Sequence, residues 1–246
     1  MVTESGGPGR VEPEERTERG ERILDAACEL LLAWGYRRVT TDEIARRANV
    51  GKGTVYLHWK TKDALLLAVV LRAKSCDHAR QLARIRADHR NILPSRLLRW
   101  ALLDFMEDPV LRAVYLDDSD VLGRLNAVAK KEMAELVAES IQTLRTQLTT
   151  LREHGLVKKD LSVDQQMYAC MSISAGFFQA EALFPEHTPD RAEDRADVLC
   201  HTVRTTLETH TDPDPRLIAA AAPAIIALYQ RLEELSRQEV RRQLRP

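Results

Sequence analysis

Basic side chains gather in one short stretch of this sequence, between Trp34 and Lys62. Seven lysines and arginines lie there against only two acidic residues, so the segment carries five net positive charges. The whole chain of 246 residues is formally −1 at pH 7. A local basic patch on a nearly neutral protein is suited to binding phosphate groups, and therefore nucleic acid. The alternative that charge alone leaves open is a solvated surface joining two core helices.

Motifs that would carry catalysis or hold a metal are not found in the sequence. There is no Gly-rich phosphate loop, no G-x-S-x-G, no H-E-x-x-H and no paired His/Cys cluster. The histidines show no spacing typical of metal ligands, and the four cysteines form no C-x-x-C pair. We therefore expect a protein that is not an enzyme, binds no metal or cofactor and keeps its cysteines as small buried residues.

Two short helices separated by a tight turn must position the basic side chains. Thr41 is a suitable N-cap for the first, and the two acidic residues that follow it suit the positive end of a helix dipole. The sequence Asn-Val-Gly at 49–51 interrupts the pattern, because Asn and Gly tolerate the left-handed conformation. A second helix over about 52–58 should turn Val55 and Trp59 inward. This arrangement is a helix-turn-helix.

The segment resembles the DNA-binding domain of the TetR family of bacterial transcriptional regulators. That family combines an opening helix I-x-x-A-x-x-L-(F/L)-x-x-x-G with T-(T/V)-x-x-I-A-x-x-A-G-V-S-x-G-T-(L/V)-Y-x-(H/Y)-F-x-(S/N/T)-K-x-x-L. The spacing is kept over about residues 20–66, with Asn49, Gly51 and Trp59 in place of the usual Gly, Ser and Phe. The matching residues are Ile23, Ala26, Ala27, Leu30, Leu31, Gly35, Thr40, Thr41, Ile44, Ala45, Ala48, Val50, Gly53, Thr54, Val55, Tyr56, His58, Lys62 and Leu65.

The resemblance implies DNA contacts from the second helix and its flanks. Lys52, Thr54 and Leu57 are candidates for base edges, because lysine can donate to guanine and apolar groups can meet a thymine methyl. By family analogy the phosphate contacts come from Thr41, Tyr56, His58 and Lys62, with His58 as an ordinary surface residue the alternative. The full predicted DNA-binding set is Thr41, Lys52, Gly53, Thr54, Tyr56, Leu57, His58 and Lys62.

Composition favours an all-α protein. The chain is rich in Ala, Leu, Arg and Glu, poor in aromatic residues, and shows no alternating strand pattern. It has no run of about 18 apolar residues, and its first residues lack the apolar core of a signal peptide. We therefore expect a helical protein of the cytoplasm without a membrane span.

The periodicity and the resemblance together divide the chain into four parts. Residues 1–18 are expected to be a disordered arm, and 19–66 the three-helix DNA-binding domain, whose first helix runs over about 18–34 and ends at Gly35. Residues 67–210 should form a larger helical domain for effector binding and dimerisation. Residues 211–246 add a helix that either covers the core or extends the dimer interface.

Several further helices are predicted after the DNA-binding segment. Thr61 should cap a long helix whose segment 64–71 is apolar nearly all round and therefore buried on several sides. Pro94 should begin the next helix, and Ser162 should cap the helix over 163–183. The remaining predicted helices cover about 110–116, 122–128, 130–153, 190–209 and 216–244.

Beyond DNA binding, the resemblance implies a homodimer that responds to a small molecule. In the family, the helices corresponding to 163–183 and 190–209 pair with their copies as a four-helix bundle, which suits a palindromic operator. Few charged residues interrupt the apolar faces, so a largely apolar effector is expected. The candidate pocket residues, each of which could instead be ordinary core, are Trp100, Phe105, Met106, Tyr115, Met133, Met171, Phe177 and Phe178.

The function we expect is that of a sequence-specific homodimeric repressor. A small, largely apolar effector would release it from its operator by shifting the balance between two dimer states. Two alternatives remain, an activator and an architectural DNA-binding protein without a ligand response. A sequence-specific operator would exclude the architectural protein.

Overall fold

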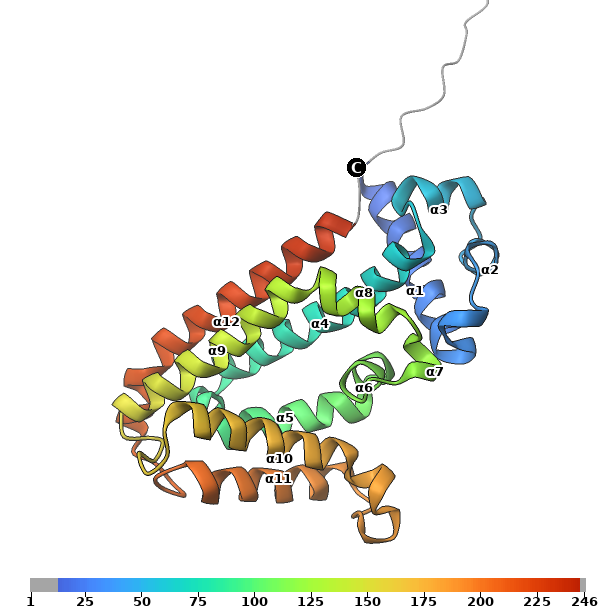
Figure 1. Cartoon of the computed structure of the whole chain (residues 1–246). Coiled ribbons are helices and arrows are strands. Elements are labelled where there is room, and N and C mark those ends of the chain that lie inside the picture. Colours follow the sequence, from blue (N-terminus) through green and yellow to red (C-terminus); the bar gives the residue numbers. More distant parts are fainter. Residues whose placement is uncertain (1–12, 244–246) are drawn as a thin grey trace, which may run out of the picture.

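The computed structural model describes residues 13–243, and these residues form helices connected by short turns (Figure 1). No strand occurs among them, and an isolated antiparallel bridge joins Val157 to Glu208. The predicted all-α class is confirmed. No helix within residues 13–243 is long and apolar enough to cross a membrane. The elements are α1 (Pro13–Arg38), α2 (Thr41–Arg47), α3 (Lys52–His58), α4 (Lys62–Ala87), η1 (His89–Ile92), α5 (Pro94–Glu107), α6 (Pro109–Tyr115), α7 (Ser119–Leu122), α8 (Leu125–Glu132), α9 (Ala134–Glu153), α10 (Val163–Leu183), η2 (Pro185–His187), α11 (Ala192–Leu207) and α12 (Pro215–Gln243).

The predicted helix-turn-helix is confirmed as α2 and α3, with one correction at its start. Thr40, and not Thr41, is the N-cap of α2, because its extended backbone lets its hydroxyl accept a hydrogen bond from the Glu43 amide at 3.2 Å. Asn49 adopts the left-handed conformation, with φ of 53°. Gly51 caps α3 without a side-chain hydrogen bond, as its replacement of Ser implies.

Helix α1 is longer than the sequence pattern suggested. It begins at Pro13, so residues 13–18 are helical and not part of a disordered arm, while the rest of that predicted arm, 1–12, lies outside the described residues. Gly35 interrupts the helix as expected, with φ of 72° and ψ of 162°. A side chain at this position would also collide with the carbonyl oxygen of Asp120, so α1 and α7 approach each other closely here.

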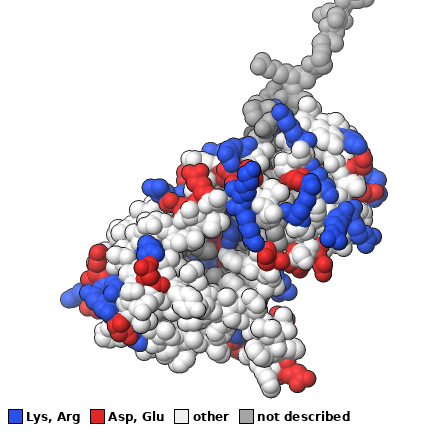
Figure 2. Space-filling model, in the orientation of Figure 1, with Lys and Arg blue, Asp and Glu red and all other residues white. Residues whose placement is uncertain are grey.

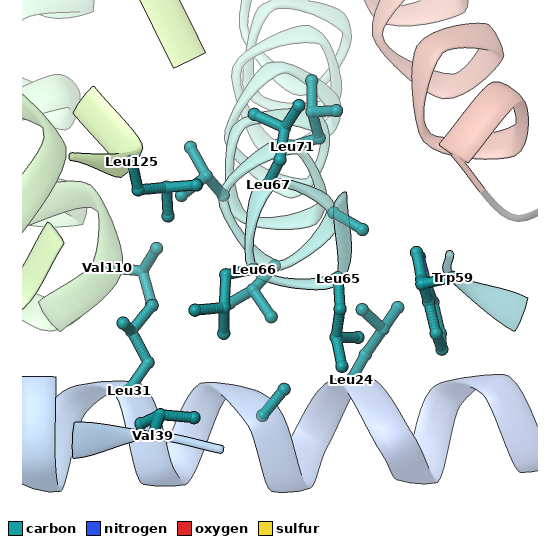
Figure 3. Packing of buried hydrophobic residues seen from close by; sticks show 14 of the residues in the cluster. Leu24, Leu31, Val39, Trp59, Leu65, Leu66, Leu67, Leu71, Val110 and Leu125 are labelled. Atoms are coloured by element: carbon teal, nitrogen blue, oxygen red, sulfur yellow. The ribbon is translucent and has the colours of Figure 1, made fainter. Parts of the chain in front are cut away.

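Helix α4 is the central element of the molecule. Thr61 caps it as predicted, accepting a hydrogen bond from the Ala64 amide at 3.1 Å. All seven residues of the run Leu65–Leu71 are buried. Figure 3 shows the four labelled leucines of this run near α1 on one side and near Val110 and Leu125 of the second part of the chain on another. The core of the helix-turn-helix segment is therefore continuous with the core that follows it.

The remaining helices form two further packing groups around α4. Helix α12 lies along α4 and α9, and α10 packs against α5, α9 and α11 (Figure 1). The cap predicted at Ser162 is confirmed, and it is part of a capping box in which Ser162 and Gln165 each bond the other's backbone amide. Helix α12 buries Ile218, Ile225 and Leu232, so it covers the core of its own chain.

Two predicted helix boundaries were wrong between residues 116 and 140. The helix expected over 122–128 is interrupted by Gly123, whose φ of 52° ends α7 and lets the Tyr36 ring pack against its backbone. The helix expected over 130–153 begins only at Ala134. Within α9, Val137 and Ile141 are half-exposed while the polar Gln147 is buried.

Two buried polar side chains of the helical core, Gln147 and His78, have specific hydrogen-bond partners. Gln147 donates to the Ile92 carbonyl at 2.7 Å and accepts from the Tyr229 hydroxyl at 3.0 Å. His78 of α4 lies 2.6 Å from the Ser236 hydroxyl of α12. Ser236 donates its only proton to the Leu232 carbonyl, so the hydroxyl accepts from His78 Nδ1–H. Burial, with a contribution from the Lys74 charge, lowers the pKa of His78 to about 3.

The neutral state of His78 should make the protein sensitive to acid. A folded-state pKa below the ordinary value of 6.5 means that this stabilisation is complete above pH 6.5 and is lost as the pH falls towards 3. Moving from about pH 7 to about pH 5 should cost roughly 2 kcal/mol of unfolding free energy through this residue. Urea unfolding of His78→Gln at both pH values should lack that loss, whereas His201→Gln, at an exposed histidine, should retain it. An unchanged pH dependence in His78→Gln would contradict the assignment.

Candidate DNA-reading face and effector cavity

Helix α3 presents a surface that we call the reading face, formed by Lys52, Gly53, Tyr56 and Leu57. Tyr56 is 45% exposed and Leu57 is 72% exposed, which is unusual for apolar side chains of this size. On the opposite side of α3, Val55 and Trp59 are buried as predicted. The helix is therefore held by its inner face, and its outer face is free to contact a partner.

Lys52 already has an ionic partner on the reading face. Its ammonium group lies 2.9 Å from the Asp42 carboxylate of α2. The hydrogen bond and the charge of Asp42 raise the pKa of Lys52, so the lysine is a permanent cation. Both side chains are more than half exposed, so solvent screens the pair and an exchange of Asp42 for a phosphate or a base acceptor is inexpensive.

The structure places four of the predicted DNA-binding residues away from the reading face. Thr41 and Thr54 are half-buried. His58 is only 5% exposed, packs against the Trp59 ring, and has its pKa lowered by burial. Lys62 points inward, donating to the carbonyls of Tyr36 and Val39 at 2.9 and 3.1 Å. Lys62 therefore holds the α1–α2 junction together.

Further exposed arginines and lysines lie in the same part of the chain as the reading face and extend the predicted set. Arg37, Arg38 and Lys60 are exposed, and within the described part of the chain they form no ion pair. Arg46 is also exposed, although it contacts Glu43. In Figure 2, blue side chains are frequent over the part of the molecule that contains α1–α3 and sparse over its lower half. The charge count pointed to these residues, but the family motif did not single them out.

Tyr36 links the first three helices to the second part of the chain. Its hydroxyl donates to Asp63 at 2.6 Å and accepts from Arg124 at 2.5 Å, and Arg124 also contacts the other Asp63 oxygen at 2.7 Å. The Lys62 ammonium lies 4.2 Å from the centre of the Tyr36 ring. The end of α1, the start of α4 and the residue before α8 are thus joined in one hydrogen-bonded group.

A cavity of about 420 Å³, called here the first cavity, lies between α5, α10 and α11. Four predicted pocket residues line it: Phe105, Met106, Phe177 and Phe178. Its charged lining residues are Glu181 and Arg195, which pair with each other at 3.1 Å. The remaining lining residues are Leu102, Ala180, Phe184, His187, Thr188, Pro189 and Val198.

A second cavity of about 290 Å³ lies one turn further along α5 and α10. It is lined by the predicted residues Tyr115, Met171 and Phe178, and it has no charged residue in its lining. Tyr115 and Met171 are both partly exposed, so this cavity reaches the surface beside them. The other lining residues are Leu98, Ala101, Leu144, Cys170, Ser174, Ala175 and Gln179.

Three aromatic rings stand where the two cavities meet. Phe105 and Phe178 stack at 4.6 Å between ring centres, and Tyr115 lies 5.1 Å from Phe178 and 6.2 Å from Phe105. The Lys74 ammonium of α4 donates to the Tyr115 hydroxyl at 2.8 Å and lies 4.2 Å from the ring centre. The aromatic group is therefore in direct contact with α4, and a movement of its rings would be felt by that helix.

Two predicted pocket residues lie elsewhere. Trp100 is on another side of α5, where its indole donates to Asn91 at 3.2 Å and packs between the guanidinium groups of Arg84 and Arg99. Met133 belongs to the core shared with the DNA-binding helices. Helical periodicity identified both as inward-facing, but it does not tell which of several packing groups a face meets.

The part of the chain that contains the helix-turn-helix matches a known family. Residues 23–69 match the family model of bacterial regulatory proteins of the tetR family. The uncharacterised HTH-type transcriptional regulator YvkB of Bacillus subtilis is 46% identical over 55 residues, which is 22% of this chain and 29% of that protein. Matches of this kind are confined to a short segment.

A longer match extends through the second part of the chain. The HTH-type transcriptional activator FasR of Mycolicibacterium smegmatis is 30% identical over 174 residues, covering 67% of this chain and 78% of FasR. The chain belongs to the TetR family. As a member of that family it is a DNA-binding transcriptional regulator, which confirms the predicted family.

The fold of this TetR-family chain is also found among solved structures. The transcriptional regulator FadR of Bacillus subtilis, in a crystal structure with stearoyl-CoA, has a TM-score of 0.56 and 18% identity, over 74% of this chain and 96% of FadR. At this identity the likeness establishes the shared helical architecture.

Gly53 offers a test of the reading face. A Cβ at this position would meet no atom of the protein within 4 Å, so Gly53→Ala should fold normally and gain up to about 1 kcal/mol from helix propensity. The added methyl group would project from the reading face, where it would hinder close approach of DNA. We expect thermal stability to be kept or raised while affinity for a selected duplex, measured by fluorescence anisotropy, falls at least about tenfold. Equal affinity for the variant and the wild type would show that DNA does not approach Gly53.

Proposed function

We propose that this TetR-family regulator is a homodimer that binds a palindromic operator and leaves it when a small, largely apolar effector enters the first cavity. The observation that carries the proposal is the reading face, with exposed Tyr56 and Leu57 beside Lys52 in an otherwise well-packed helix-turn-helix. In the proposed division, residues 19–66 read DNA and 67–210 bind the effector and the second subunit. The protein would act in the cytoplasm, where its operator is.

The reading face would enter the major groove. Lys52 would donate to a base acceptor, and Leu57 would meet a thymine methyl. Tyr56 would contact a phosphate, as would Arg37, Arg38 and Lys60 at the flanks. Thr41 and Thr54, which are half-buried, would contribute at the edge of the interface. The proposed phosphate contacts of His58 and Lys62 would require both side chains to leave their present partners.

The dimer interface would be formed by α10 and α11. Helix α10 carries an outward-facing stripe of small and apolar residues, with Tyr168 72% exposed and Leu183 60% exposed at its two ends. Figure 2 shows few charged side chains on the surface where α10 lies. Such a surface favours burial against a second copy, and a symmetric pair would present two reading faces to two half-sites.

An apolar effector is favoured by the chemistry of the first cavity. Its volume lies within the range of about 300–1,000 Å³ common for ligand sites, and its charged pair is already neutralised internally. FadR, which shares the fold, has been crystallised with stearoyl-CoA. The contact between Tyr115 and Lys74 would transmit occupancy to α4, since the same helix begins at Lys62 against the DNA-binding helices.

An activator is the second candidate, because FasR, the relative matched over most of its length, is a transcriptional activator. Selection of bound sequences from random duplex DNA at two salt concentrations tests the common part of both proposals. A recovered palindrome supports the dimeric regulator, and transcription in vitro from a promoter carrying it separates repression from activation. Binding without a recovered motif, lost steeply as salt rises, would replace the proposal with an architectural role.

Gly176 tests the proposed dimer. It lies on the exposed stripe of α10, and a Cβ there would meet no atom of its own chain within 4 Å. Gly176→Arg should therefore leave the folded subunit intact while placing a long charged side chain in the interface. Light scattering after gel filtration should show the wild type as a dimer and Gly176→Arg as a monomer. The matched control Ala220→Arg, on an exposed position of α12, should remain dimeric.

Two results would contradict this interface. A wild type that is a monomer at micromolar concentration would remove the dimer, and a dimeric Gly176→Arg would place the interface elsewhere. Thermal unfolding of each variant shows whether the subunit is folded, so loss of the dimer is not confused with loss of the fold.

A further inference from the structure

Phe178 belongs to the walls of both cavities. The first cavity meets Leu102, Phe105 and Met106 of α5, and the second meets Leu98 and Ala101 of the preceding turn. Phe178 of α10 lines each of them, so the two volumes lie on either side of one side chain. Its ring is partly buried and is held by the stack on Phe105.

The volumes of the two cavities favour their occupation by a single ligand. The second cavity, at about 290 Å³, is slightly below the usual range for ligand sites, which begins near 300 Å³. The first, at about 420 Å³, is at the lower end of that range. Joined through the position of the Phe178 ring, they would form one elongated apolar volume in the middle of that range.

The two ends of this joined volume differ in polarity. Glu181, His187 and Arg195 all line the first cavity, whereas the second has no charged residue in its lining. A molecule with one polar end would therefore keep that end among these side chains of the first cavity and extend its apolar part towards Phe178. A compact or uniformly polar molecule would gain nothing from the second cavity.

We propose that the two cavities are one binding site for a straight-chain amphiphile, divided by Phe178 as a movable partition that selects for chain length. The proposal rests on the effector role given above to the first cavity. A short chain fills the first cavity and leaves Phe178 stacked on Phe105. A long chain displaces the Phe178 ring, enters the second cavity and presses on Tyr115, whose ring lies 5.1 Å from Phe178.

This arrangement makes chain length the signal. Because Tyr115 contacts Lys74 of α4, a chain that reaches the second cavity acts on the helix that packs against α1 and follows the reading face in the chain. A chain that stops at Phe178 is bound without that effect. Phe178 is thus a residue that determines which ligands act and not only which ligands bind.

Calorimetry with hexanoate, decanoate and hexadecanoate tests the partition on the full-length protein. In the wild type, affinity should rise from the shortest probe to the longest, because each added methylene buries more apolar surface. In Phe178→Trp, a larger ring should close the passage, so hexadecanoate should lose about tenfold or more while hexanoate is little changed. Phe178→Ala should bind hexadecanoate more tightly than the wild type does.

Phe184→Ala is the matched control, because Phe184 lines the first cavity at the surface and does not face the second. It should change the affinity of all three probes alike. A second readout is the affinity for selected operator DNA, which hexadecanoate should lower in the wild type and hexanoate should not. Thermal unfolding confirms that each variant is folded, and Phe178→Leu replaces Phe178→Ala if that variant is not.

The outcomes separate this inference from the effector proposal. If probes bind but their length dependence is the same in wild type, Phe178→Trp and Phe178→Ala, the partition is wrong and the effector cavity stands. If none of the three probes binds any variant, the amphiphile is the wrong ligand class. A failure of the effector proposal itself would appear as probe binding, with any length dependence, that leaves operator affinity unchanged.

Discussion

The run Leu65–Leu71 imposes the main constraint on this protein, because a helical segment that is apolar on every side must be covered on every side. Helix α1 covers part of it, and α6, α8 and α12 cover the rest. Burying seven such residues contributes roughly 1.5–3 kcal/mol for each large side chain. The position of the reading face relative to the cavities is therefore fixed by the burial of α4 before any specific polar contact is considered.

Polar contacts then decide how that apolar junction is oriented. Tyr36, Asp63 and Arg124 join α1, α4 and α8 by directional hydrogen bonds, and Lys62 occupies carbonyls at the end of α1 that would otherwise be unpaired. Lys74 makes the corresponding contact with Tyr115 at the other side. Apolar packing tolerates small rotations, whereas these groups have preferred geometries. A ligand that disturbs one of them can shift α4 without exposing its core.

Features that depend on residues close in the sequence were predicted correctly. Features that depend on contacts between residues far apart in the sequence were not. The left-handed Asn49, the buried Val55 and Trp59 and the cap at Ser162 all follow from local patterns. Gly123 was not recognised as a helix break, because its conformation is set by the Tyr36 ring, more than eighty residues earlier in the chain. Local patterns indicate turns and helix caps, but they do not show which other element a helix face packs against.

The same limit explains the candidate sites. Motif and charge pointed to the residues of the reading face, but His58 and Lys62 face inward because Trp59 and the α1–α2 junction occupy their surroundings. Six of the eight predicted pocket residues line the two cavities, while Trp100 and Met133 serve other contacts. Periodicity reports that a residue points inward, and only the tertiary arrangement determines whether it meets a cavity, a guanidinium group or another core.

The shared core around α4 also bears on whether the DNA-binding segment is a portable module. A cut between residues 66 and 67 would pass through a helix, leave Leu65 and Leu66 at a frayed end and remove the cover that Val110, Leu122 and Leu125 give to α1 and α4. A fragment ending there would lose part of its own interior. Transferring this DNA-binding segment to another regulator would therefore require including the whole of α4 and providing a new apolar surface for α4 to pack against.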